Sequence, residues 1–265
     1  MQLAAVVLTL LSIITSSSSS SLQEWLSINP LHSSCLQSTN QLPSIYKGLL
    51  CGAPLAADEA ILFKRLGLYH LVVVSGAHLV FLEHLMNLCL PTQLRLKCLV
   101  LVGYGSVCQF NPPITRALLN YLCRYLNKTE SLFLRNSGTT LVSGLLSLSL
   151  FPEWSQSLSL PLSWVASLAI SLSSNRTTQC LWVYALTLPL LLAFTNPTPL
   201  TVLYNIIVTP FFSFFLFPLT LISFFIPPLH NLGTSIWNGT YTVSEWFPAA
   251  VGSDGLTLTT SPLSA

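Results

Sequence analysis

The stretch that most constrains the fold runs from Gly67 to Leu90 and reads GLYHLVVVSGAHLVFLEHLMNLCL. A bilayer is crossed by a helix of about 20 predominantly apolar residues, and this stretch is long and apolar enough to be one. Ser75, Gly76 and His78 nevertheless interrupt its middle. Irregular backbone at membrane depth is tolerated only where protein buries it or where it lines a wet cavity. The sequence therefore predicts a broken or re-entrant helix at this point.

Charge is scarce along the whole chain. Only 7% of the 265 residues are charged and 52% are hydrophobic, whereas an ordinary soluble domain is about 25% charged. Lipid is the solvent that tolerates such a surface. The net charge of +2 is too small to indicate, by itself, a surface that binds nucleic acid. The composition predicts an all-α protein, a polytopic integral membrane helical bundle with broken or re-entrant helices.

Hydropathy divides the chain into parts. We expect a short apolar segment and a Ser-rich linker over residues 1–21, a polar extramembrane region over 22–60, a membrane domain over 61–230, and an interfacial helix with a C-terminal tail over 231–265. Apolar segments are expected at about 67–90, 96–110, 132–151, 158–174, 180–195 and 200–226.

Positive charge should mark the cytoplasmic loops. Lys64 and Arg65 precede the segment 67–90, and Arg95 and Lys97 follow it. The rule therefore leaves open whether this segment crosses the membrane or enters and leaves on the same side.

The segment ITRALLNYLCRYLN, residues 114–127, carries Arg116, Asn120, Arg124 and Asn127 at helical spacing. Such spacing gives one polar stripe on an otherwise apolar helix. One interpretation is a helix at the membrane surface with its arginines in water. The other is a cationic stripe that faces a passage for an anionic polymer.

The cysteines and histidines indicate no metal site. The cysteines include no CxxC pair, which argues against a zinc ribbon. On a helix, His78 and His84 of HLVFLEH would point about 240° apart and could not share an ion. Cys35 and Cys51 lie 16 residues apart in the polar region and could form a disulfide if that region is outside the cytosol.

The Ser-Gly step has two further interpretations. Ser75 and His78 are three residues apart and could hydrogen-bond on one helical face, as in a membrane-embedded Ser-His hydrolase. The G-x-S-x-G elbow is absent, and nothing in the sequence specifies an oxyanion hole. Alternatively, the small Ser75 and Gly76 let another membrane helix approach closely. We expect no enzyme activity, no catalytic residue and no cofactor.

Four motifs follow one another in the order of a known family. GLYHLVVVSGAHLVFL resembles the signature of the ComEC competence family, in which Gly-Leu-x-His-Leu leads to an apolar stretch and then Ser-Gly-x-His. PPITRALLN resembles the family's segment ending in Arg-Ala. LPLSWVASLAI is similar to its Phe-Gln-Leu-Ser-Phe-x-Ala motif, with Leu160 and Pro161 in place of Phe and Gln. PLTVLYNIIVTPFFSFFLFP resembles a later segment in which Asn precedes Pro.

The resemblance implies a ComEC-like membrane competence domain over residues 61–230, in a multi-pass protein of the cell inner membrane. Its role would be a channel that translocates single-stranded DNA into the cytoplasm during natural transformation. Family members often add an OB-like domain and a metallo-β-lactamase-like domain, and this chain is too short for either in full. A non-catalytic structural relic of the family remains an alternative. The residues carried over as DNA passage or family motif are His70, Ser75, Gly76, His78, Arg116, Ser163, Asn205 and Pro210.

The resemblance also implies partners. They are single-stranded DNA, membrane lipid, a separate DNA receptor and a cytoplasmic ATPase motor. A separate motor is needed because the chain has no G-x-x-x-x-G-K-[ST] loop. Formation of a homo-oligomer is left open.

Overall fold

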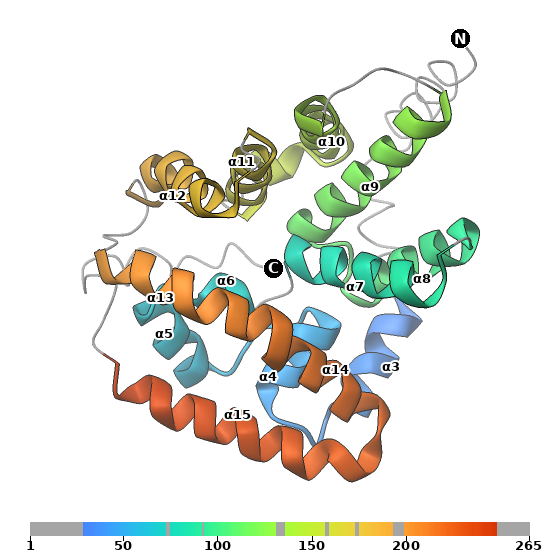
Figure 1. The fold of residues 1–265 in the computed structure, drawn as a ribbon. Coiled ribbons are helices and arrows are strands. Elements are labelled where there is room, and N and C mark those ends of the chain that lie inside the picture. The colour runs from blue at the N-terminus through green and yellow to red at the C-terminus, as the bar shows by residue number, and fades with distance from the viewer. Residues whose placement is uncertain are drawn as a thin grey trace.

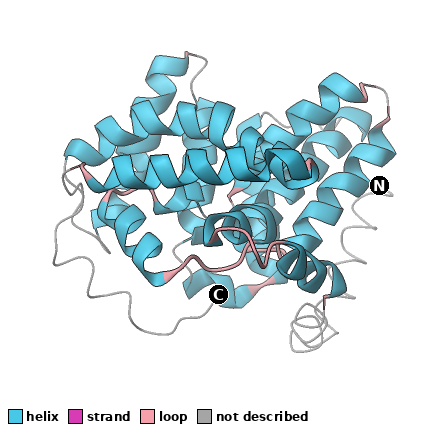
Figure 2. Ribbon diagram, turned by 90° about the horizontal axis from the view of Figure 1, so that it is seen from below, coloured by secondary structure: helices cyan, strands magenta, loops and turns pink. Residues whose placement is uncertain are grey.

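The computed structural model describes residues 29–72, 75–91, 93–130, 136–156, 159–172, 175–192 and 199–247. Every regular element in these ranges is helical, so the expected all-α class is confirmed (Figures 1 and 2). The predicted N-terminal segment 1–21 and the tail after residue 247 lie outside the described residues. In chain order the elements are α3 (Pro30–Ser38), α4 (Ser44–Tyr46), η1 (Lys47–Cys51), α5 (Ala57–Arg65), α6 (Tyr69–Val72), α7 (Gly76–Cys89), α8 (Leu94–Val107), α9 (Pro112–Glu130), α10 (Asn136–Leu150), η2 (Pro152–Gln156), α11 (Ser159–Leu172), α12 (Arg176–Leu192), α13 (Pro199–Phe211), η3 (Phe212–Leu216), α14 (Phe217–Phe225), η4 (Pro227–Leu229) and α15 (His230–Glu245).

The segment 67–90 is not one helix. The short α6 ends at Val72 and α7 begins at Gly76. Ser75 has extended backbone angles, φ −126° and ψ 163°, and is the N-cap residue of α7. The interruption therefore lies at the Ser-Gly step, and only the later part of the stretch, over 14 residues, forms a long helix.

Two buried apolar clusters hold the helices together. The first joins η1 and α6 to η3, α14 and α15, through side chains such as Leu49, Val72, Phe217 and Trp237. The second joins α7, α8 and α9. Helices α10, α11 and α12 pack against one another in a row, and α14 with α15 forms a hairpin (Figure 1). Both clusters place the start of α7 between α9 and the η3–α14 segment.

The N-terminal helices belong to the first cluster although their sequence is polar on average. Tyr46 is fully buried, and its phenol hydroxyl lies 2.9 Å from the Ser223 Oγ of α14. Leu49 is fully buried as well. This part of the region 22–60 therefore packs directly on helices that come more than 170 residues later in the chain.

One described helix is long and apolar enough to cross a membrane. It runs from Leu203 to Phe225, over α13, η3 and α14, with a mean hydropathy of 2.0. Shorter apolar helices run over Leu96–Val107, Ser159–Leu172 and Leu181–Leu192. By length and composition the described residues thus contain a single full-length candidate span.

A disulfide joins α3 to η1 and gives a first testable prediction. Cys35 and Cys51 are bonded, with their Cα atoms 5.8 Å apart and 16 residues of separation. Closing a loop of this size restricts the unfolded chain and typically stabilises a protein by about 3 kcal/mol. Replacing both cysteines by serine should lower the free energy of unfolding in detergent by that amount. The exposed Cys89→Ser variant is the control. Equal stability of the wild type with and without reductant would contradict the prediction.

Candidate functional site

His78 caps the helix that follows the break. The backbone N–H of Ser75 donates to His78 Nδ1 at 3.1 Å. In a capping box, the third helical residue is usually Glu or Gln and accepts the N–H of the N-cap residue. A histidine does so here, which requires an unprotonated Nδ1 and keeps the buried site free of charge. The Ser-Gly-x-His motif thus supplies both the N-cap residue of α7, Ser75, and the side chain that caps it, His78.

The imidazole of His78 also packs on the π-helical turn η3. It is 4% exposed and stacks on Phe217, with ring centroids 4.2 Å apart and planes 15° apart. Phe212 lies 6.0 Å away, and Phe81 meets Phe217 edge-on at 5.5 Å. Phe212 begins η3 and Phe217 follows it. Because π-helical turns occur frequently at functional sites, the junction of His78 with η3 is a candidate site.

Gly76 brings α7 against α9. A Cβ atom on Gly76 would lie 3.2 Å from the Pro113 carbonyl oxygen and 3.3 Å from the Ala117 Cβ. Small residues allow such close approach of helices in membranes. The first turn of α7 is therefore held on one side by α9, through Gly76, and on the other by η3 and α14, through His78.

Arg116 of α9 is buried next to this contact. It is 4% exposed, and its Nε donates to Ser163 Oγ of α11 at 3.0 Å. Its Nη1 is buried and has no hydrogen-bond partner, and the same holds for the Asn120 Oδ1 one turn later. Within the described ranges the ion pair found is Arg124 with Glu83, so no carboxylate neutralises Arg116. A buried cation without a counter-charge is costly, and this site calls for an anion or water.

Arg124 has a different environment from Arg116. Its side chain is 42% exposed, and its Nη2 donates to Glu83 of α7 at 2.8 Å. Glu83 therefore pairs with an arginine, and no group of three metal-ligating side chains occurs within the described part of the chain. The two arginines predicted on one stripe thus meet different neighbours.

The motif that begins at Gly67 also contacts the motif that contains Asn205. Asn205 Nδ2 donates to the Thr201 carbonyl at 2.7 Å, and the Gly67 carbonyl lies 3.5 Å from the same nitrogen. Gly67 has φ +70°, the left-handed region that favours glycine. His70 is exposed in this arrangement. Pro210 belongs to α13, and its side chain lies outside the described set.

A substitution at Gly67 tests this contact. An alanine would have an unfavourable φ, and its Cβ would lie 2.7 Å from Thr201 Cγ2. Gly67→Ala should lower the free energy of unfolding by about 2 kcal/mol, as measured by chemical denaturation in detergent. Adding Thr201→Ser removes Cγ2 and should recover part of the loss. Gly103→Ala, where a Cβ would meet nothing within 4 Å, is the control. A double variant no more stable than Gly67→Ala would contradict the steric explanation.

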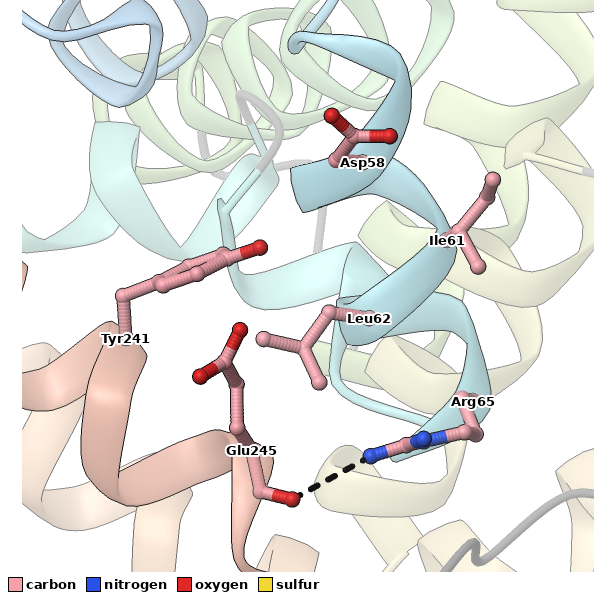
Figure 3. A pocket seen from close by; sticks show the side chains of 6 residues that line it. All are labelled: Asp58, Ile61, Leu62, Arg65, Tyr241 and Glu245. Atoms are coloured by element: carbon pink, nitrogen blue, oxygen red, sulfur yellow. Dashed lines mark hydrogen bonds between the residues drawn. The ribbon is translucent and has the colours of Figure 1, made fainter.

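A pocket of about 300 Å³ lies between α5 and α15, away from the motif residues (Figure 3). Desolvation raises the pKa of the Tyr241 phenol there, and Glu245, Asp58 and Glu59 raise it further. Figure 3 shows Arg65 directed at the backbone oxygen of Glu245, at 3.5 Å. This pocket contains none of the motif residues, and two of its lining residues, Asp58 and Glu245, are acidic. The lining residues are Asp58, Ile61, Leu62, Arg65, Tyr241 and Glu245.

The structure thus defines an all-α protein whose interrupted helices meet at a buried polar junction. A family model described as Competence protein matches residues 53–254. The chain belongs to this family, and the resemblance to the ComEC competence family is confirmed. The family is membrane-associated and takes part in the DNA uptake of competence. Neither the curated proteins nor the solved structures contain a match to the chain.

Proposed function

We propose that this chain is an inner-membrane channel component that translocates single-stranded DNA into the cytoplasm during natural transformation. The observation that carries the proposal is the buried Arg116, whose Nη1 has no partner and whose charge no described carboxylate neutralises. A guanidinium binds phosphate with strong, directional hydrogen bonds. A DNA backbone that passes α9 would supply the missing anion.

A site that conducts DNA should make few charged contacts with it. A conducting site must bind its substrate well enough to admit it and weakly enough to release it. One buried guanidinium meets a phosphate without holding a long stretch of DNA. Many phosphate contacts would bind DNA tightly and make release slow. Movement through such a site needs an external motor, so a cytoplasmic ATPase remains the proposed partner, together with a DNA receptor.

We further propose a polytopic bundle in which some helices re-enter. Helices α7 and α8 each have 14 residues, or about 21 Å, which is shorter than the hydrocarbon core of about 30 Å. Two short helices joined at residues 90–93 can enter and leave on one side. Large apolar side chains that a bilayer would cover are exposed on many helices, among them Leu99, Leu145, Ile170, Leu181, Ile207, Phe214 and Phe225.

The function is tested by disrupting the gene in its host. Labelled DNA should still bind at the cell surface, and its arrival in the cytoplasm should fall to background. Complementation with the intact gene should restore uptake. Unchanged cytoplasmic uptake in the disrupted strain would refute the proposal and would favour a structural relic.

A membrane hydrolase that uses Ser75 and His78 is the alternative from another class. In this structure the backbone N–H of Ser75 donates a hydrogen bond to the Nδ1 of His78. That nitrogen is therefore engaged in capping and does not act as a base toward the Ser75 hydroxyl. Labelling by a serine-reactive phosphonate that is lost in Ser75→Ala would support the hydrolase instead.

A further inference from the structure

Helix α10 turns a row of hydroxyl groups inward. Thr139, Thr140, Ser143 and Ser147 are all buried, at 3% exposure or less. Each hydroxyl donates to a carbonyl of its own helix: Ser143 to Thr140 and Ser147 to Ser143, both at 2.8 Å, and the two threonines to Asn136 at 2.9 Å. The opposite face carries exposed apolar side chains, Leu141 and Leu145. The helix is therefore polar inside and apolar outside.

Helix α10 packs on α9, the helix that carries the unpartnered polar atoms, and on α11. Among the helix pairs of this structure, α10 packs most extensively on α9. On α11, the Trp164 Nε1 donates to the Thr140 carbonyl at 3.0 Å. Its neighbour Ser163 accepts the Nε hydrogen of Arg116, whose buried Nη1 is unpartnered. Asn120 Oδ1 on α9 is also buried and without a partner. Helices α9, α10 and α11 thus contribute polar groups to the boundary between them, which we call the seam.

Close helix packing alone does not account for this seam. Small residues on α10 would explain the approach of α9 and α11. Packing gains nothing from a guanidinium nitrogen and an amide oxygen left unpaired in the same place, because each costs desolvation free energy. Hydroxyl hydrogens can rotate, so a hydroxyl bonded to its own helix can exchange that bond for one to a ligand. The seam is therefore suited to hydrogen-bond a polar polymer. After the polymer leaves, the hydroxyls can bond to their own helix again and the seam can close without water.

We propose that the seam between α9, α10 and α11 is the route of the nucleic-acid strand, closed in this structure and opened by separation of α10 from α9. This inference rests on the proposed translocation of single-stranded DNA. Arg116 meets the phosphate, Asn120 Oδ1 offers a hydrogen-bond acceptor one turn further for a base N–H, and the α10 hydroxyls line the opposite wall. Thr139, Ser143 and Ser147 recur every four residues, so the wall extends about 12 Å along the helix.

Cysteine accessibility tests the route in the full chain, within the membrane of the transforming host. Ser143→Cys places a thiol in the seam. Ser149→Cys is the matched control, because Ser149 makes the same kind of own-helix bond, to Leu145 at 2.9 Å, but is exposed on the outer face. A membrane-impermeant cationic methanethiosulfonate is added during uptake, and peptide mass spectrometry locates the label.

We expect label at residue 143 during uptake, loss of uptake once that label is attached, and protection by excess single-stranded DNA. Residue 149 should stay unlabelled under the lipid. No label at 143, or equal label at both positions, would overturn the route. If Ser143→Cys does not accumulate, Thr139→Cys takes its place with the same expectations. Normal uptake by Arg116→Ala would count against the proposed function, whereas loss of uptake in that variant with an unlabelled seam counts against the route alone.

Discussion

Replacing Arg116 by alanine should reduce the arrival of DNA in the cytoplasm roughly 10- to 100-fold, because a hydrogen bond to a charged group contributes about 1.5–3 kcal/mol. Binding of DNA at the cell surface should not change, since Arg116 is buried. The measurement is uptake of labelled DNA into the cytoplasm, normalised to surface-bound DNA and to the amount of protein in the membrane.

Two variants separate charge from geometry. Arg116→Lys keeps a cation but loses the Nε bond to Ser163, so uptake should be intermediate. Arg124→Ala is the matched control on the same helix. Its side chain is 42% exposed and pairs with Glu83, and exposed ion pairs contribute about 0–1 kcal/mol. If the alanine variants at 116 and 124 transport DNA equally well, the role assigned to Arg116 is wrong.

The second large effect is expected at His78. His78→Ala removes the acceptor of the Ser75 N–H and the ring that stacks on Phe217. It leaves an unpaired backbone donor and a cavity, so the free energy of unfolding should fall by about 3 kcal/mol or more. Thermal unfolding of the protein in detergent and its abundance in membranes report this loss. Uptake should fall with it, because α7 would no longer be held between α9 and η3.

Two substitutions at the same position divide the capping role from the packing role. His78→Gln can accept the Ser75 N–H, as glutamine does at this position in a capping box, but it cannot stack. His78→Phe can stack on Phe217 but cannot accept the hydrogen bond. Each should recover part of the stability lost in the alanine variant. Full recovery by phenylalanine would show that the cap contributes nothing, and no recovery by either would contradict both roles.

Local sequence was a good guide to the helices and to the place where one is interrupted. The apolar runs with few charges predicted an all-helical chain, and every regular element in the described ranges is helical. The Ser-Gly step predicted a break, and α7 begins at Gly76. Both features depend on residues within one or two turns of each other. Such short-range preferences are visible in sequence because they need no distant partner.

Local sequence was a weaker guide to which polar residue is buried. Arg116 and Arg124 lie eight residues apart, so their directions differ by about 80° on a helix. One is buried at Ser163 and the other is exposed beside Glu83. Periodicity places both on a broad polar stripe. The helices that cover each part of that stripe come from other segments of the chain, and they decide the burial.

The polar N-terminal region shows the same limit. Its average composition predicts an extramembrane region, which stays a prediction, but it does not indicate that Tyr46 and Leu49 are fully buried in the first apolar cluster. Their partners lie on η3, α14 and α15, far along the chain. Average polarity carries no information about a few apolar residues that meet such partners. The same reasoning applies to Asn120, because the distant helices that cover it leave its Oδ1 buried without a hydrogen-bond partner.

The sequence by itself determined the helical class, the Ser-Gly interruption and the family, because these follow from composition, short-range spacing and motif order. Only the tertiary structure decided what the motif residues do to one another. In the folded chain His78 caps α7 and stacks on Phe217, and Gly76 packs closely against Ala117. Arg116 is buried, bonds to Ser163 and has no counter-charge among the described residues. The physical reason is that capping and spacing act along the chain, whereas desolvation and charge pairing depend on which distant helices close over a side chain.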